Sequence, residues 1–98
     1  MIAAFVTFRC RDPLDERRVR EIARTARAKF EGMPGLRLKA FTVNAGKREV
    51  VNVYLWTSED AARAFFDDQR LEQIGALYGV PPMIEIVPIA ALVENTER

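Results

Sequence analysis

Histidine is absent from the 98-residue chain, and cysteine occurs only once, as Cys10. Without an imidazole, neither a Ser-His-Asp nor a Cys-His catalytic arrangement can form. A zinc site lacks ligands of the usual kind, histidine-ligated haem is excluded, and no internal disulfide is possible. We therefore expect any small-molecule chemistry here to proceed with no metal and no tightly bound cofactor.

Glycine and net charge are also scarce. The five glycines are scattered, and none belongs to a GxGxxG motif or a P-loop. A net charge of +1 gives no overall field that attracts nucleic acid or an acidic membrane. The apolar run Met1–Phe8 is too short for a membrane span or a signal peptide. We expect a cytoplasmic protein that binds neither nucleic acid nor membrane.

Apolar residues recur with two different periods along the chain. Runs rich in β-forming residues predict four strands, over residues 2–8, 36–44, 49–57 and 83–93. A first helix is expected to follow Asp12, the candidate N-cap, with Pro13 at its first helical position. Its apolar stripe has helical spacing and consists of Val19, Ile22, Ala23, Ala26 and Phe30.

A second helical segment is expected from Ser58, a plausible N-cap, to the stop signal at Gly79. Its apolar stripe loses phase at Asp67 and Asp68, which predicts a break or kink there. Residues 94–98 are expected to form a loose tail.

The elements follow the order β-α-β-β-α-β within one domain that spans residues 1–98. With right-handed crossovers, this order is typical of the α+β ferredoxin-like βαββαβ sandwich, whose antiparallel sheet has strands one and three at its centre. Pro88 agrees with this fold, because a proline within a strand is tolerated mainly at a sheet edge, where strand four would lie.

Pairing Asn44 with Glu49 in the central hairpin gives the sheet two unlike faces. The aromatic face pairs Phe41 with Asn52, Lys39 with Tyr54 and Arg37 with Trp56. The aliphatic face, suited to packing under helices, carries Leu38, Ala40, Thr42, Val51, Val53 and Leu55. A two-layer monomer would then leave the aromatic face in water, which soluble monomers rarely do. We therefore expect a homodimer in which a second copy covers that face.

Asn52, Tyr54 and Trp56 alternate along the third strand and therefore project to one side. An amide, a phenol and an indole can line a pocket for a small aromatic molecule, because rings stack and the amide both donates and accepts hydrogen bonds. The same side chains could equally be interface bulk, where aromatic enrichment is ordinary. The further candidates for substrate binding are Phe41, Lys39, Arg37 and Tyr78.

Four segments carry a family resemblance: Pro34-Gly35-Leu36, Lys39-Ala40-Phe41-Thr42, Tyr54-Leu55-Trp56-Thr57-Ser58-Glu59-Asp60-Ala61-Ala62 and Phe65-Phe66. They resemble the YdhR-like monooxygenases of the dimeric α+β barrel superfamily, to which antibiotic-biosynthesis monooxygenases belong. The resemblance implies a homodimer whose sheets close into a barrel with a pocket in each subunit. It also implies oxidation of polycyclic phenols or quinols by molecular oxygen with neither metal nor flavin.

In the enzymes of that superfamily, an asparagine and a tryptophan four residues apart contribute to the pocket, and Asn52 and Trp56 have this spacing. The resemblance therefore gives these two residues the catalytic roles. A tyrosine six residues beyond the tryptophan is Ala62 here. Haem-degrading relatives need a histidine, which this chain lacks.

Three functions stay open at this point. The first is a cofactor-independent monooxygenase acting on an aromatic quinol or a polyketide-like molecule. The second is a non-catalytic homodimer that binds a small molecule. The third is an RNA-binding module that stacks bases on Phe41, Tyr54 and Trp56, although the RNP1 motif is absent.

Overall fold

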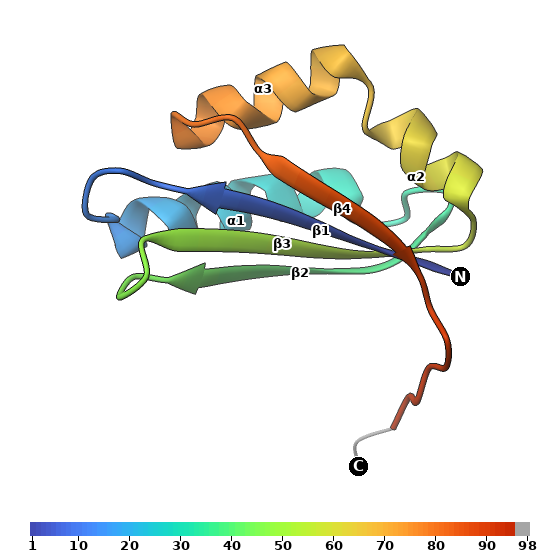
Figure 1. Ribbon diagram of the computed structural model, residues 1–98. Helices are drawn as coiled ribbons and strands as arrows, with labels where there is room; N and C mark the ends of the chain where they lie inside the picture. The colour runs from blue at the N-terminus through green and yellow to red at the C-terminus, as the bar shows by residue number, and fades with distance from the viewer. Residues whose placement is uncertain (96–98) are drawn as a thin grey trace.

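A computed structural model describes residues 1–95. Four strands form one antiparallel sheet, and three helices lie on one face of it (Figure 1). The strands are β1 (Ile2–Arg9), β2 (Leu36–Asn44), β3 (Glu49–Trp56) and β4 (Met83–Pro88). The helices are α1 (Glu16–Phe30), α2 (Glu59–Phe65) and α3 (Asp68–Tyr78). The strand order β2-β3-β1-β4 places β1 and β3 at the centre, so the predicted α+β ferredoxin-like fold is confirmed.

The first helix begins later than predicted. Asp15, and not Asp12, is the N-cap, since its side chain accepts a hydrogen bond from the Arg18 N–H at 3.2 Å. The prediction of Asp12 was wrong because the residues after it stay outside the helix, where Leu14 packs against the core. Helix α1 then buries Val19 and Ile22 of the predicted stripe.

The second helical segment is divided in two, as predicted. Ser58 caps α2 through the Ala61 N–H at 3.1 Å, and α2 ends at Phe65. Asp67 then caps α3 through the Arg70 N–H at 2.8 Å. Helix α2 buries two of its residues, whereas α3 has no fully buried residue. The break therefore lets α2 pack tightly while α3 lies less closely on the sheet.

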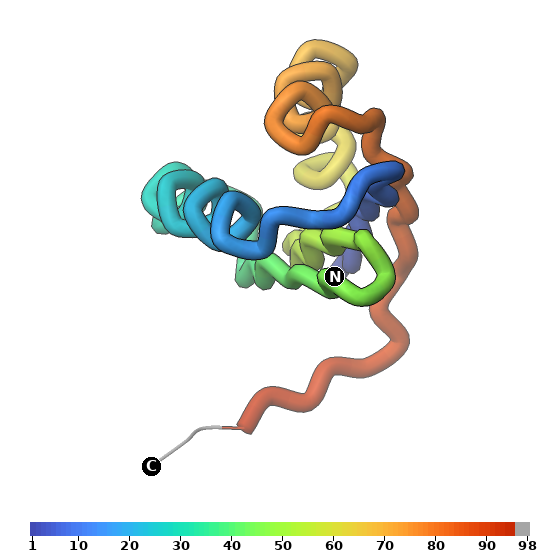
Figure 2. Tube along the Cα trace, turned by 90° about the vertical axis from the view of Figure 1, so that its left-hand side faces the viewer, coloured from blue at the N-terminus to red at the C-terminus, as the bar shows by residue number. Residues whose placement is uncertain are grey.

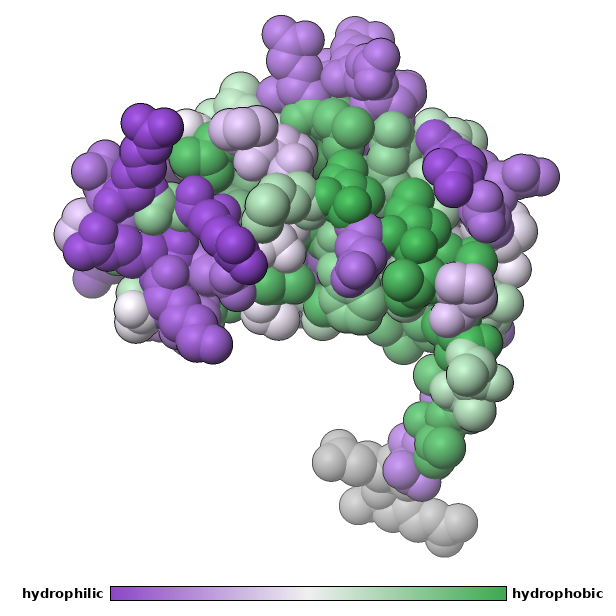
Figure 3. Space-filling view, in the orientation of Figure 1, coloured by the Kyte–Doolittle hydropathy of each residue, from purple (hydrophilic) through white to green (hydrophobic). Residues whose placement is uncertain are grey.

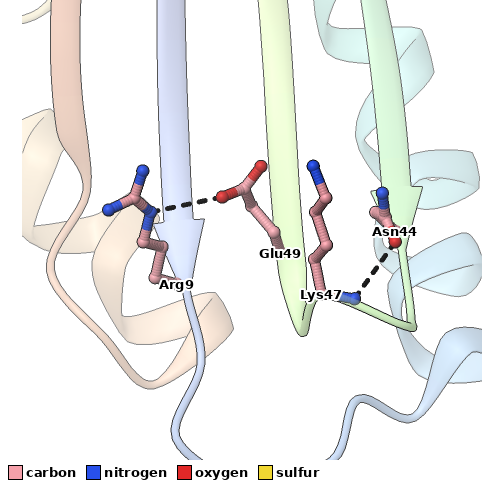
Figure 4. A network of polar contacts seen from close by, with 4 residues as sticks. All are labelled: Arg9, Asn44, Lys47 and Glu49. Carbon is pink, nitrogen blue, oxygen red and sulfur yellow. Dashed lines mark hydrogen bonds and ion pairs between the residues drawn. The ribbon is translucent and has the colours of Figure 1, made fainter.

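The β2–β3 hairpin has the predicted register, with Asn44 opposite Glu49. In the turn, Asn44 Oδ1 accepts a hydrogen bond from the Lys47 backbone N–H at 3.1 Å (Figure 4). Across the sheet, Glu49 Oε2 pairs with Arg9 Nε at 3.2 Å (Figure 4). These contacts fix the end of the hairpin beside β1.

At the other end of the hairpin, the predicted Arg37–Trp56 pair was wrong. A register shift between Leu36 and Leu38 places Leu36 opposite Trp56. An irregularity of this kind leaves one residue out of the pairing. Arg37 is therefore exposed, and its Nη2 lies 3.6 Å from a Glu94 carboxylate oxygen.

The aromatic face of the sheet lies under the helices, which corrects the predicted orientation. Asn52 is 2% exposed, and Tyr54 and Trp56 are also buried. The decisive contacts come from rings at the ends of helices: Phe30 of α1, Phe65 of α2 and Phe66, the C-cap of α2, lie with their centroids 5.0 to 6.1 Å from that of Tyr54. Alternation alone could not choose the face, because each face carries large apolar side chains, aromatic on one and aliphatic on the other. Burial of Tyr54 and Trp56 also removes them from any exposed surface on which RNA bases could stack.

The aliphatic face is the one without helices (Figure 2). Leu38 is 46% exposed on this face, beside exposed Ala40 and half-buried Val53. Apolar residues also gather in the middle of the space-filling view, over the strands (Figure 3). One side of the sheet thus keeps apolar surface in contact with water.

The last strand is shorter than the predicted range 83–93, because β4 ends at Pro88. Pro88 lies on an edge strand, as predicted, and has no N–H with which to continue a ladder. The chain then leaves the sheet (Figure 1). In the predicted tail, residues 94 and 95 have no regular structure, and residues 96–98 lie outside the described residues. Across residues 1–95, no helix is both long enough and apolar enough to cross a bilayer.

Gly35 provides a test of how α2 is fitted to the sheet. Its φ is +84°, and a Cβ atom there would lie 3.0 Å from the Ala61 Cβ. Gly32 also has a positive φ, +71°, but open space around its Cα. We predict that Gly32→Ala lowers the free energy of unfolding by about 1–2 kcal/mol through backbone strain alone. Gly35→Ala should cost clearly more in the same urea titration.

The double variant Gly35→Ala/Ala61→Gly is the control, because it removes the clash and keeps the strain. It should be destabilised less than the Gly35→Ala and Ala61→Gly losses added together. Equal losses for Gly32→Ala and Gly35→Ala would contradict the steric account.

Candidate functional site

A cavity of about 470 Å³ lies between the aromatic face of the sheet and helices α1 and α3. Ile22, Phe30, Phe41 and Ile74 supply much of its apolar wall. This volume lies within the range of sites for small organic molecules, which combine apolar walls with a few polar groups. The cavity exists because α3 roofs the sheet without burying a whole side chain in it.

A second groove, of about 720 Å³, borders the connection between β1 and α1. It is larger, but it mixes acidic and basic residues, including Asp12, Asp15 and Arg18, with the half-buried Cys10. None of the buried side-chain atoms that lack a partner within residues 1–95 belongs to its lining. We therefore take the smaller, aromatic cavity as the candidate site.

Polar atoms of β3 are buried at this face with no hydrogen-bond partner among residues 1–95. They are Asn52 Oδ1, Tyr54 Oη and Trp56 Nε1. Such an atom costs about 1–3 kcal/mol when it stays unpaired. Asn52 and Tyr54 line the cavity, so a bound molecule can pair with both residues, whereas Trp56 does not border it.

Lys39 extends its ammonium group over three aromatic rings. Nζ lies 3.5 Å from the ring centroid of Phe30, 4.1 Å from that of Phe41 and 4.3 Å from that of Tyr54. Desolvation by burial lowers the pKa of Lys39 from 10.5 to about 7. The negative ring faces favour the charged form and act against this shift. Lys39 therefore changes its charge near neutral pH.

Two phenols in the cavity are held in their neutral form. Burial raises the pKa of Tyr54, with a further rise from Tyr78 and an opposing effect of Arg70. Burial also raises the pKa of Tyr78, and the nearby Asn52 side chain partly offsets that rise. Both hydroxyl groups therefore stay available as hydrogen-bond donors.

The charged side chains of the cavity wall are all cations. Lys29 and Arg70 join Lys39, and no Asp or Glu among the described residues lines the cavity. The Arg70 guanidinium lies 4.2 Å from the ring centroid of Phe65. A wall of aromatic rings and positive charge complements an aromatic ligand that carries a negative charge.

Most of the predicted site residues come together in this cavity. Five of the seven line it: Asn52, Tyr54, Phe41, Lys39 and Tyr78. Trp56 lies behind the wall and stacks on Tyr54, with centroids 5.9 Å apart and planes inclined by 9°. Arg37 is turned to solvent and does not line the cavity. The catalytic roles of Asn52 and Trp56 stay predictions.

Arg70, Phe30 and Lys29 were not predicted as site residues. A signal for Arg70 was present, because Arg70, Ile74 and Tyr78 follow one another at four-residue helical spacing and so share a face of α3. No comparable signal marks Lys29, which lies at the end of α1 beside Phe30. Its place depends on how α1 crosses the sheet.

No protein-family profile matches the chain, and no curated protein matches its sequence. Solved structures do match. A monooxygenase from the gene ActVA-Orf6 of Streptomyces coelicolor, in complex with nanaomycin D, is 25% identical, with 96% of this chain and 92% of that chain covered and a TM-score of 0.68. SnoaB from Streptomyces nogalater, a cofactor-independent oxygenase, is 22% identical, with 96% and 98% covered and a TM-score of 0.60. A Caulobacter crescentus protein provisionally named an antibiotic biosynthesis monooxygenase is 19% identical, with 92% and 90% covered and a TM-score of 0.67.

The chain has the antibiotic-biosynthesis monooxygenase fold. The resemblance to that superfamily is therefore confirmed, while the narrower YdhR-like assignment stays a prediction. In this monooxygenase fold the cavity lies inside one chain, under its helices, and its wall combines unpartnered amide and phenol oxygens with a lysine among aromatic rings.

In this chain with the monooxygenase fold, the half-buried Lys39 should link stability to pH. Its folded pKa of about 7 lies below the ordinary 10.5, so between these values the unfolded chain binds more protons than the folded chain. The contribution of this residue to the free energy of unfolding therefore rises with pH across that window, by at most about 1.4 kcal/mol per pH unit. At pH values below the folded pKa, Lys39 is charged in both states and destabilises the folded chain to the full extent. Urea unfolding at a series of pH values measures the slope.

Lys39→Met should remove this slope, since methionine has no ionisable group. Lys47→Met, which changes an exposed lysine of the β2–β3 turn, should leave it in place. The same pH dependence in wild type and Lys39→Met would show that Lys39 is not desolvated.

Proposed function

We propose that this chain is a cofactor-independent monooxygenase that oxidises an aromatic quinol bound in the cavity. The observation that carries the proposal is the aromatic cavity with two unpartnered oxygen atoms, Asn52 Oδ1 and Tyr54 Oη. Its fold supports the proposal, because the matched structures include a cofactor-independent oxygenase. They also include a monooxygenase in complex with nanaomycin D.

The proposed reaction needs no external reductant. A quinol and one molecule of oxygen contain together the atoms of a hydroxyquinone and one water. One oxygen atom enters the ring, the other leaves as water, and all four electrons come from the quinol. An ionised quinol can pass an electron to oxygen directly, so the protein has to orient it, exclude water and stabilise its negative charge.

Three side chains of the cavity wall, and Trp56 behind it, have a proposed part in this task. Asn52 donates from its amide NH₂ to a substrate oxygen and accepts from a substrate hydroxyl at Oδ1. Phe30 and Phe41 stack on the ring system. Trp56 acts through its contact with Tyr54, whose ring it holds parallel to its own.

We predict oxygen uptake when purified protein is mixed with a panel of dihydroxynaphthalenes, at rates above those of the uncatalysed reaction. Asn52→Ala should lower the catalysed rate by about a hundredfold, a typical loss for one donor to a developing oxyanion. Asn44→Ala is the matched control, because Asn44 lies in the turn away from the cavity and should leave the rate unchanged. Mass spectrometry should show a product that has gained one oxygen atom and lost two hydrogens.

Uptake that never exceeds autoxidation across the panel would reject the proposed activity. An Asn52→Ala rate equal to that of wild type would reject the role of Asn52 but not the activity.

We also propose that the chain forms a homodimer through its aliphatic sheet face. Leu38 is 46% exposed there and no helix covers the strands (Figure 2). Soluble monomers seldom expose contiguous apolar area of this kind, and a second sheet packed on this face would bury it.

Sedimentation equilibrium should therefore give twice the mass of one chain. Leu38→Lys should shift the population to monomer, because it places a charge in the proposed interface. Leu77→Lys is the control, since Leu77 is similarly exposed, at 52%, but lies on α3. A monomeric wild-type protein at micromolar concentration would contradict this proposal.

A further inference from the structure

Two features of the surroundings of Lys39 act on its charge in opposite directions: burial disfavours the ammonium, and the faces of the nearby rings stabilise it. Its Nζ lies within 4.3 Å of three ring centroids, and no carboxylate among the described residues lines the cavity on that side. The other charged groups of that wall are the exposed Lys29 from α1 and the half-buried Arg70 from α3, neither of which can act as a counter-ion for an ammonium. Tyr54 and Tyr78, from β3 and α3, are neutral phenols there.

On its other side, Lys39 borders a shallow pocket of about 270 Å³ that also contains Arg27, Glu31 and Arg37. Glu31 is the acidic group there, but its carboxylate is paired with Arg27 Nε at 3.3 Å. Arg37 in turn contacts Glu94. The charges on this side are therefore already paired, and Lys39 forms no ion pair within residues 1–95.

We infer that Lys39 is the proton acceptor for a fused-ring phenol bound in this cavity and, once protonated, the counter-ion of the phenolate that forms. The inference rests on the proposed function and assigns the base that the reaction needs. The O–H bond of the phenol breaks, its electron pair stays on the phenol oxygen, and the proton forms a new N–H bond at Nζ. No oxidant or reductant takes part in this step.

Three observations support this assignment over that of a simple anion-binding lysine. An amine that is half neutral near pH 7 can accept a proton there, which an ordinary lysine cannot. The rings beneath Nζ stabilise the ammonium once it has formed. The cations Lys29 and Arg70 line the same cavity and can attract the phenolate after the transfer. The ligand class that follows is an uncharged polycyclic phenol that becomes an anion in the site.

Alizarin, a hydroxylated anthraquinone whose colour changes when its phenol ionises, is a suitable probe. Its absorption spectrum in the presence of excess protein reports the ionised fraction as pH is varied. We expect the wild-type protein to lower the apparent pKa of the bound dye by roughly 1 unit or more. Lys39→Met should abolish that shift, while Lys47→Met should retain it.

Lys39→Arg separates the base from the counter-ion. Arginine stays charged and cannot accept a proton, but it still attracts a phenolate. The variant should therefore bind the ionised dye above its free pKa with wild-type affinity, yet lose most of the oxygen-uptake kcat at neutral pH with little change in KM. Circular dichroism and thermal unfolding verify that both Lys39 variants fold.

Several results would overturn the inference: no binding of alizarin, an unshifted ionisation of the bound dye, a shift that survives in Lys39→Met, or full turnover by Lys39→Arg. These results leave the monooxygenase proposal intact if quinols still drive oxygen uptake. Conversely, a shift that depends on Lys39, with no oxygen uptake from any quinol, supports the proton acceptor and rejects the monooxygenase.

Discussion

Alternation along β3 places an amide, a phenol and an indole on the sheet face that the helices cover. Burial of such polar groups is unfavourable unless they find partners, and three of their atoms have none within residues 1–95. The rings of Phe30, Phe65 and Phe66 pack around Tyr54 and limit the contact of this face with water. The remaining features of the site depend on this burial.

The break between α2 and α3 turns that buried face into a cavity. Helix α2 packs Ala62 and Phe65 into the core and closes one end of the sandwich. Helix α3 starts afresh at the cap Asp67 and buries no complete residue, so it forms a roof and leaves space beneath it. Arg70 and Tyr78 point from this roof into the same space as Asn52. A continuous helix over residues 59–78 could not combine tight packing at one end with this space at the other.

Lys39 shows how a single position on the sheet acquires chemistry from its surroundings. On β2 it is one of several exposed or half-exposed residues of an edge strand. The Phe30 ring at the end of α1 lies over it, and together with Phe41 and Tyr54 shields its ammonium group from part of the solvent. Its proton affinity is thus set by side chains from three different elements.

Much of the fold could be predicted from local patterns. The element order, the cap at Ser58, the break at Asp67 and the edge position of Pro88 each depend on residues close in sequence. The choice of buried face could not be predicted, because each face of the hairpin carries large apolar side chains and the rings that decide it come from other parts of the chain. The register shift at Arg37 was missed because no residue near it marks where a strand bulges. The cap at Asp15 was missed because Asp12 is an equally suitable capping residue three positions earlier.

The candidate site could be predicted only as far as strand alternation determines it. Strand alternation brought Asn52 and Tyr54 together with Phe41 and Lys39, and the structure places all four in one cavity. Alternation also grouped Trp56 with them, although it lies behind the wall. The helical spacing of Arg70 with Tyr78 was a signal that went unused, whereas Lys29 joins the cavity only through the placement of α1, which no local pattern specifies.

The most direct test is an NMR titration of the Lys39 side chain, observed through its Cε and Nζ chemical shifts. Desolvation among aromatic rings predicts a midpoint near pH 7, far below that of an exposed lysine such as Lys47 in the same spectrum. A midpoint for Lys39 at the ordinary value of 10.5 would contradict the lowered pKa on which the proposed proton transfer depends.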